Sequence, residues 1–441
     1  MQLTDCQANA SELFEDFLES EATVFGLFGF AGTGKSFMLA RFIKEYIVGS
    51  PALLASPTHK AAHVMRRFLT AADVPYSGFD PNSPVPIVGT TAQLLGIRPT
   101  IGEEQDSHDL KFAKVAKGYM EQMLDLGWVV IDEVSMLSSD QFKMVVRLAR
   151  ERGARVLVVG DPGQLPPVNA GRIDFKTFRY RAVLKEVCRT ADETGITALA
   201  TAIRKDEDWK RIRGSAIERV RDAAGTYISE ISEPFSTDEM DWSVYVAYRN
   251  AAVDSVNEAV CQKLYGHSRS DIADGEIVLA GNTLQGPYIK GLGKTPLCTN
   301  GETLIVERVG RRGRWGVNID VRSLQTGMVF IAEYLPENEL RDRNHPYNVK
   351  LTELRAKAEH LQKEFRETGE NDALRRQAWG EYFSLRDDTV LSLVHPFAMT
   401  SHKSQGSTYR RAFVDATDMA AFDRRALYVG VTRPSEELVI G

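Results

Sequence analysis

The stretch GFAGTGKS, residues 29–36, lies between an apolar run at 23–30 and a helix-like amphipathic segment at 36–48. It matches the pattern G-x-x-x-x-G-K-[S/T], whose glycines let the backbone wrap closely around phosphate groups. The amino end of a following helix adds favourable positive partial charge. A glycine-rich turn could match this pattern by chance, but the flanking strand and helix patterns favour a phosphate-binding loop.

Apolar runs alternate with helix-like stretches through the first 190 residues. Three further runs are almost continuously apolar, at 52–58, 128–134 and 155–162. Such runs are typical of parallel strands that helices bury on both faces. The sequence therefore predicts an α/β fold with crossover helices.

Two insertions interrupt the α/β pattern, which begins again at 244–250 and resumes at 390–400. Residues 96–113 predict a small hairpin. Residues 301–335 hold three alternating strands separated by glycine-rich turns, which predicts a small β-barrel. A charged helical stretch, 346–386, follows the barrel.

Composition sets broad limits on function. The 441 residues, 43% hydrophobic and 26% charged, are typical of a globular protein with several domains. A net charge of −6 argues against a blanket of positive charge, but amides and hydroxyls can still bind phosphates locally. No run of eighteen apolar residues and no signal-peptide pattern is present, so we expect a cytoplasmic protein without a membrane span.

Two adjacent carboxylates follow the apolar run in VVIDEVSM, residues 129–136. The carboxyl ends of strands are where open α/β sheets bind their ligands. Asp132 could hold Mg²⁺ together with Ser36, Glu133 could polarise an attacking water, and Lys35 could neutralise phosphate charge. Alone, such a pair would more often be solvated carboxylates at a strand end. Together with the glycine-rich loop it predicts a nucleoside triphosphatase.

Seven further stretches resemble the motifs of superfamily 1 helicases, in the family's order and across nearly the whole chain. Its 5′→3′ branch, which includes RecD and the Dda helicase of T-even phages, is the most similar. The matches to motifs Ia, Ib, III, IV, IVa, V and VI are LASPTHKAA (54–62), GTTAQLLGI (89–97), VVGDPGQLPPV (158–168), LKEVCRT (184–190), AYRNAAVDSVN (247–257), TSHKSQGST (400–408) and LYVGVTRP (427–434).

The resemblance implies two RecA-like P-loop domains that bind ATP between them. It also implies a pin hairpin inserted in the first domain, and an SH3-like barrel with a helical extension inserted in the second. The implied boundaries are 1–95 and 114–205 for the first domain, 96–113 for the hairpin, 206–242 for a connector, 243–268 and 389–441 for the second domain, and 269–388 for the barrel and its helices.

Roles follow by resemblance for residues that match the motifs. The implied catalytic residues are Lys35, Asp132, Glu133, Gln164, Arg189 and Arg433. The implied nucleotide-binding residues are Gln7, Gly29, Ala31, Gly32, Thr33, Gly34, Lys35, Ser36, Gln405 and Gly406, with Ser36 and Asp132 also on Mg²⁺. The implied DNA-binding residues are Thr58, His59, Thr91, Thr400 and His402, with Phe112 as a candidate wedge in the pin.

Some of these residues have plainer interpretations. Arg433, taken alone, would be an ordinary cation at a helix carboxyl end. His59 and His63 have the spacing of a zinc pair, but Lys60 stands where a metalloprotease needs a glutamate, and no third ligand is evident. The helicase motifs favour a contact between His59 and DNA.

The sequence therefore predicts an ATP- and Mg²⁺-dependent DNA helicase that moves 5′ to 3′ on single-stranded DNA and opens forked duplexes. We expect a monomer, in the host cytoplasm if a phage encodes it, with a single-strand-binding or replisome protein as a further partner. The alternatives are an RNA helicase and a nucleic-acid-stimulated ATPase that remodels complexes without unwinding. A small-molecule kinase would have no use for motifs III, V and VI.

Overall fold

The computed structural model describes residues 3–78, 80, 83–100, 111–114, 117–123, 125–167, 170–186, 194–289 and 293–441. The chain divides into two compact units. Unit 1 comprises Met1–Ala224, Tyr245–Asn250 and Met399–Gly441, and unit 2 comprises Gly225–Val244 and Ala251–Ala398. Among the described helices, none combines the length and the apolar composition that a membrane span requires.

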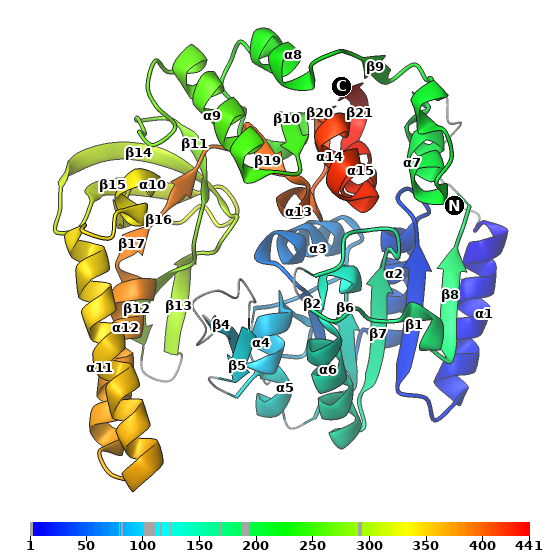
Figure 1. Ribbon diagram of the computed structural model, residues 1–441. Helices are drawn as coiled ribbons and strands as arrows, with labels where there is room; N and C mark the ends of the chain where they lie inside the picture. Colours follow the sequence, from blue (N-terminus) through cyan, green and yellow to red (C-terminus); the bar gives the residue numbers. More distant parts are fainter. Residues whose placement is uncertain are drawn as a thin grey trace. The chain divides into compact units, whose positions relative to one another are not determined.

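The first part of unit 1 is a six-stranded parallel sheet with the order β3-β2-β6-β7-β1-β8 (Figure 1). Pairs such as Leu53↔Val129 and Val129↔Val156 set its register. The predicted α/β fold with parallel strands is confirmed. The strands are β1 (Val24–Gly29), β2 (Ala52–Ser56), β3 (Ile87–Thr90), β6 (Trp128–Ile131), β7 (Arg155–Gly160) and β8 (Tyr180–Leu184).

Helices cover both faces of this sheet, because successive strand residues point to opposite faces. Leu27 of β1 packs in a core with helices α1, α2 and α3, whereas its neighbour Phe28 packs in a second core with α4, α5 and α6. The helices are α1 (Asp5–Glu19), α2 (Lys35–Phe42, continued by a π-helical turn Ile43–Ile47), α3 (His59–Ala71), α4 (Thr91–Leu95), α5 (Tyr119–Gln122) and α6 (Ser139–Glu151).

Strands β4 (Ile97–Thr100) and β5 (Lys111–Lys114) form an antiparallel pair in the register Ile97↔Lys114 and Thr100↔Lys111. This pair coincides with the predicted hairpin at 96–113. Its tip, 101–110, lies outside the described residues, as do the side chains of β5.

A second sheet has five strands in the order β19-β10-β20-β21-β9. The pairs β20–β21 and β21–β9 are parallel. Strand β9 lies within the stretch 206–242, which the sequence predicts as a connector. A strand of only three residues is too short to show a sequence pattern of its own. The strands are β9 (Ile217–Arg219), β10 (Ser243–Ala247), β19 (Ala398–Thr400), β20 (Tyr409–Val414) and β21 (Pro434–Ile440), and the helices near them are α7 (Ile196–Lys205), α13 (Ser401–Ser404), α14 (Ala416–Phe422) and α15 (Arg424–Val431).

Unit 2 contains a six-stranded sheet with the order β17-β16-β15-β14-β11-β18. Only Ser392 separates β17 from β18, although these strands lie at opposite ends of that order. The two edges must therefore meet, so the sheet curls into a barrel. Its strands are β11 (Ile277–Ala280), β14 (Thr303–Arg312), β15 (Val317–Ser323), β16 (Val329–Tyr334), β17 (Val390–Leu391) and β18 (Leu393–Val394).

One detail of this unit differs from the sequence interpretation. Leu391 and Leu393 are buried in the barrel core, so the first part of the run at 390–400 belongs to the barrel. Only its last part, strand β19, belongs to the second α/β sheet. The charged stretch at 346–386 is two helices, because Gly369 ends the first with a left-handed φ of +74°. The remaining elements are α8 (Ala223–Glu230), α9 (Asn250–Leu264), β12 (Leu284–Ile289), β13 (Gly293–Cys298), α10 (Glu337–Arg341), α11 (Pro346–Thr368) and α12 (Asp372–Asp388).

Candidate nucleotide-binding and nucleic-acid-binding sites

The glycine-rich loop joins β1 to α2. Gly32 and Gly34 have φ values of +78° and +82°, which L-residues with side chains rarely adopt. A Cβ on Gly29 would lie only 2.6 Å from Thr33 Oγ1. The loop therefore needs these glycines to turn tightly into the amino end of α2, where unpaired amides favour an anion.

Lys35 and Gln7 both contact this loop. Lys35 Nζ donates to Phe30 O at 2.9 Å, and Thr33 Oγ1 donates to the same oxygen at 2.8 Å. Gln7 is buried on α1, where its Nε2 lies 3.5 Å from Thr33 O and its Oε1 accepts from Thr4 N. Gln7 therefore lies beside the loop while it also caps its own helix.

A pocket opens beside the loop. Residues 30–33 form one wall, and Arg204 of α7 lies over the Phe30 ring, 3.4 Å from its centroid. Tyr428 and Thr432 from the region of α15 line the same pocket. Space for a ligand thus exists between the loop, α7 and α15.

Glu133 stands out by its backbone. It has φ +52° and ψ +40°, the left-handed conformation that costs a residue with a side chain of order 1 kcal/mol or more. Its amide donates to Asp132 Oδ1 at 2.9 Å. Its Oε2 is buried and has no hydrogen-bond partner among the described residues. Strain and an unpaired acceptor coincide at the residue that the sequence predicts to activate water.

The two carboxylates have perturbed pKa values. Burial, and next the charge of Glu133, raises the pKa of Asp132 to about 7. Burial also raises the pKa of Glu133, against the opposing charges of Lys35 and Arg433. A hydrogen bond from Gln164 acts in the same direction as those cations. Four predicted catalytic residues therefore lie close enough to Glu133, or to its neighbour, to interact electrostatically.

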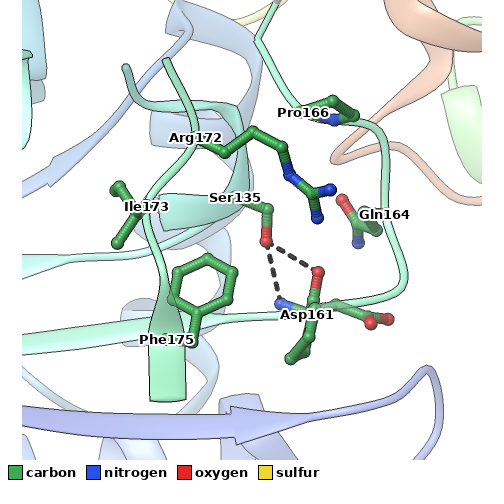
Figure 2. A pocket seen from close by; sticks show the side chains of 8 residues that line it. Ser135, Asp161, Gln164, Pro166, Arg172, Ile173 and Phe175 are labelled. Atoms are coloured by element: carbon green, nitrogen blue, oxygen red, sulfur yellow. Dashed lines mark hydrogen bonds between the residues drawn. The ribbon is translucent and has the colours of Figure 1, made fainter. Parts of the chain in front are cut away.

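The loop after β7 is fixed by reciprocal hydrogen bonds (Figure 2). Ser135 Oγ donates to Asp161 O at 2.8 Å and accepts from Asp161 N at 3.1 Å. Asp161 Oδ1 accepts from Gly163 N at 2.8 Å. Gln164 is buried in this loop and lines a small pocket with Arg172. The carboxylate of Asp161 therefore shapes the segment that carries Gln164.

Tyr428 joins that loop to the glycine-rich loop. Its hydroxyl donates to Asp161 Oδ2 at 2.7 Å and accepts from Ala31 N at 3.1 Å. Burial and the charge of Asp161 raise the pKa of Tyr428. Neither Tyr428 nor Asp161 is among the site residues predicted from the sequence. Both lie inside motif matches, but only the structure shows that they meet.

Arg433 makes its hydrogen bonds within the second sheet's elements. Its Nε donates to Val429 O at 2.9 Å, and its Nη1 donates to Ser407 O at 2.9 Å and to Ser404 O at 3.3 Å. The guanidinium is almost fully buried. It therefore ties the end of α15 to the loop after α13, and its charge also acts on Glu133.

Gln405 and Gly406 lie in the loop after α13. Gln405 Nε2 donates to Leu165 O at 3.3 Å and to Gln164 Oε1 at 3.4 Å. Gly406 has a φ of +72°, and a Cβ there would lie 3.3 Å from Ala61 Cβ of α3. This loop thus contacts both the Gln164 segment and the first turn of α3.

The three predicted DNA-binding threonines lie at the amino ends of helices. Thr58 and Thr400 are the N-caps of α3 and α13, and their hydroxyl oxygens accept from Ala61 N and Lys403 N. Thr91 is only 2% exposed, so its side chain is not available for a direct contact in this conformation.

The two predicted DNA-binding histidines are neutral at pH 7. Burial, and then Arg66, lowers the pKa of His59 to about 4, and burial lowers the pKa of His402. Each ring can therefore offer a hydrogen bond but no charge. Arg189 and the side chain of Phe112 lie outside the described part of the chain.

Among the described residues, no group of three or more His, Cys, Asp or Glu side chains is arranged to hold a metal ion. Ser36 on the first turn of α2 and Asp132 after β6 remain a pair of hard oxygen donors beside the glycine-rich loop.

Known proteins resemble the chain over its full length and over parts of it. Uncharacterized protein R530 of Acanthamoeba polyphaga mimivirus is 24% identical over 506 residues, 99% of this chain and 98% of that protein. The ATP-dependent DNA helicase PIF1 of Rattus norvegicus is 28% identical over 214 residues, 44% of this chain. The match covers 30% of PIF1, so the chain spans less than a third of that relative's length.

A solved structure, the Pif1 helicase from Bacteroides in complex with ADP-AlF3 and ssDNA, has a similar fold. Its TM-score is 0.53 at 18% identity, with 100% of this chain and 92% of that chain covered.

Two parts of the chain match family models. A model described as a UvrD-like helicase C-terminal domain matches residues 395–440, which hold the predicted motifs V and VI. A model described as an AAA domain matches residues 2–224, just over half of the chain, including the glycine-rich loop and both carboxylates. The chain therefore belongs to the AAA domain family, and its residues 395–440 resemble the carboxyl-terminal domain of UvrD-like helicases.

Proposed function

We propose that this chain is a superfamily 1 helicase that hydrolyses ATP with Mg²⁺ to move 5′ to 3′ along single-stranded DNA and to unwind duplex DNA. One observation carries the proposal. Glu133 keeps a buried, unpaired oxygen in a strained backbone conformation, within the field of Lys35 and Arg433. Strain of this kind persists where the surrounding structure enforces it, which is common at active sites.

Each residue has a chemical task in this proposal. Glu133 orients the attacking water and takes its proton, and Gln164 reports the γ-phosphate to Glu133, with which it shares a hydrogen bond. Lys35 and Arg433 stabilise negative charge in the transition state. Mg²⁺, when bound, would be held by Ser36 and Asp132 and would neutralise charge on the phosphates. These donors fit the ion, because a cation beside Asp132 would offset the charge of Glu133, which disfavours the ionisation of Asp132.

Single-stranded DNA is the favoured track because the predicted contact residues suit a backbone grip without base reading. Thr58, Thr400 and the neutral imidazoles of His59 and His402 offer hydrogen bonds to phosphate. Such a grip is compatible with the net charge of −6. The Bacteroides Pif1 structure was solved with ssDNA and ADP-AlF3, which supports the same pair of ligands here. The 5′→3′ direction follows from resemblance to that branch of the family.

Other parts of the sequence interpretation stay predictions. They are the boundaries of the two RecA-like domains and their insertions, the role of Phe112 as a wedge, and the role of Arg189. The monomeric state, the cytoplasmic location and a single-strand-binding or replisome partner are also predictions.

ATP turnover with added oligonucleotides tests the proposal. We expect single-stranded DNA to stimulate the wild-type ATPase, Lys35→Ala to abolish it, and Arg433→Ala to slow hydrolysis while nucleotide binding persists. Arg411→Ala is a matched control, because Arg411 pairs with Glu437 and Glu218 on the same sheet but outside this site. Stimulation by RNA alone would favour an RNA helicase. An ATPase that ignores nucleic acid, or that survives Lys35→Ala, would contradict the proposal.

A further inference from the structure

Two aromatic rings are stacked at the surface of unit 1. Tyr248, directly after β10, and Phe422, the last residue of α14, have ring centroids 5.1 Å apart and planes only 6° from parallel. Phe422 is 57% exposed. A large aromatic side chain this exposed leaves apolar area in water unless a partner covers it.

The pair is held by a buried carboxylate. Asp418 of α14 accepts from Tyr248 N at 2.9 Å and from Arg249 N at 3.1 Å. The Arg249 guanidinium forms an ion pair with the same carboxylate, whose side chain is 2% exposed. That guanidinium also lies 5.7 Å from the Phe422 ring centroid. The geometry of the two rings is therefore fixed by the fold before any partner arrives.

The pair adjoins the strip that we propose to grip the DNA backbone. The ring of Tyr248 lies 5.9 Å from that of His402, in the first turn of α13. Thr400 begins the same helix. The groups proposed to bind phosphate and a rigid aromatic surface thus lie side by side, and the side chain of Arg249, next to Tyr248 in the chain, is 58% exposed.

Every nucleobase has a flat π-face, so an aromatic ring can stack on any base without reading sequence. We propose that Tyr248 and Phe422 form a stacking platform for one base of the single strand whose backbone contacts Thr400 and His402. The platform rests on the proposed function, because it assumes that single-stranded DNA runs along this strip. The elements of the second sheet would then bind one base by stacking, in addition to the phosphates that Thr400 and His402 contact.

Fluorescence anisotropy with a series of oligo(dT) strands tests the platform. Each strand carries a single abasic position, moved one nucleotide at a time. Phe422→Leu keeps an apolar side chain but removes the ring, and Phe422→Trp keeps a ring. Val48→Ala is the matched control, because it removes exposed apolar area at the end of the π-helical turn that continues α2, away from the second sheet.

We expect Phe422→Leu to weaken oligo(dT) binding about tenfold and Phe422→Trp and Val48→Ala to bind like wild type. For the wild type, an abasic site at one position should lower the affinity for oligo(dT) by a similar factor. For Phe422→Leu, the abasic site at that position should lower the affinity no further. The salt dependence of binding should not change, because stacking releases no counterions.

Two contrary outcomes are distinguishable. If the wild type binds single-stranded DNA and Phe422→Leu binds equally well, with the same abasic profile, the platform is wrong and the proposed function stands. If the wild type neither binds single-stranded DNA nor responds to it with faster ATP turnover, the proposed function fails and the platform fails with it.

Discussion

At the scale of single residues, the nucleotide site is a set of charges held close together by the ends of strands. Asp132 and Glu133 are neighbours in sequence, and the charge of Glu133 disfavours the ionisation of Asp132. Motif spacing predicted that Lys35, Asp132 and Glu133 belong to one site, and their catalytic roles stay predictions. The left-handed backbone of Glu133 could not be predicted, because β6 and the following turn impose it and its φ leaves no sequence signal.

Tyr428 gives the first prediction. Tyr428→Phe removes the hydroxyl that joins Ala31 N to Asp161, and a buried polar group left unpaired costs about 1–3 kcal/mol. We expect kcat/KM for ATP to fall about tenfold, since the loss acts on both loops of the site. Tyr245→Phe is the matched control, because Tyr245 is an equally buried tyrosine that donates to Asp415 away from the glycine-rich loop. Equal kinetics for Tyr428→Phe and wild type would refute the proposed link.

Asp132 gives a prediction about stability and pH. Its folded pKa of about 7 lies above the ordinary value of 3.8, so the folded state holds this proton longer than the unfolded state does. The free energy of unfolding should therefore fall as the pH rises through the window from about 4 to about 7. Thermal melting without Mg²⁺ and nucleotide checks this: the wild type should lose stability relative to Asp132→Asn across that window.

Asp140→Asn, exposed at the start of α6, serves as the control for that comparison and should melt in parallel with the wild type at every pH. Parallel curves for wild type and Asp132→Asn would show that burial does not disfavour the ionised carboxylate.

At the scale of elements, helix amino ends carry much of the site. The loop after β1 leads into α2, and Thr58 and Thr400 cap α3 and α13. The strands and the helix after the glycine-rich loop could be predicted because apolar runs and the amphipathic segment at 36–48 mark them, whereas the four-residue helix α13 could not be predicted. The burial of Thr91 could not be predicted either, because α4 packs into the core of the first sheet and only tertiary contacts decide which side of a five-residue helix faces water.

His59 at the start of α3 gives a prediction for DNA binding. Its pKa of about 4 lies below the ordinary 6.5, so it stays neutral near pH 7, as does His402. We expect affinity for single-stranded DNA at fixed ionic strength to change less than about twofold between roughly pH 8 and pH 6.5. His59→Lys would steepen the dependence of log affinity on log salt by about one unit. A steep rise in wild-type affinity as the pH falls would mean that protonated histidines bind the phosphates.

The lowered pKa of His59 also predicts how the stability of the fold depends on pH. A histidine whose folded pKa is depressed contributes stability that is present above its unfolded pKa of 6.5 and is lost as the pH falls toward 4. His59→Asn should remove this part of the acid sensitivity in urea unfolding measured across that range. Identical acid sensitivity in variant and wild type would contradict the buried, neutral histidine.

At the scale of the whole molecule, segments far apart in the chain meet in unit 1. Tyr428 contacts the loop at 30–33, and Gln405 contacts Leu165. The order of the motifs predicted that such segments converge, because the family resemblance spans nearly the whole chain. The individual contacts were not predictable, since many polar residues lie in each motif and nothing in the sequence says which pairs touch.

The insertions were predicted less completely than the α/β parts. The three alternating strands at 301–335 are present, but β11, β17 and β18 complete that sheet from separate short segments. Two-residue strands such as Val390–Leu391 carry no periodicity of their own. Only their burial against the barrel core assigns them to it.

Unwinding of forked DNA with one single-stranded tail tests whether this protein is a 5′→3′ DNA helicase. The substrates are a fork with only a 5′ tail and a fork with only a 3′ tail, each with ATP and Mg²⁺, and Lys35→Ala is the inactive control. We expect the wild type to open the 5′-tailed fork and to leave the 3′-tailed fork closed, and we expect Lys35→Ala to open neither. Opening of only the 3′-tailed fork would reverse the direction, and DNA-stimulated ATP turnover without opening of either fork would replace the helicase with a remodelling ATPase.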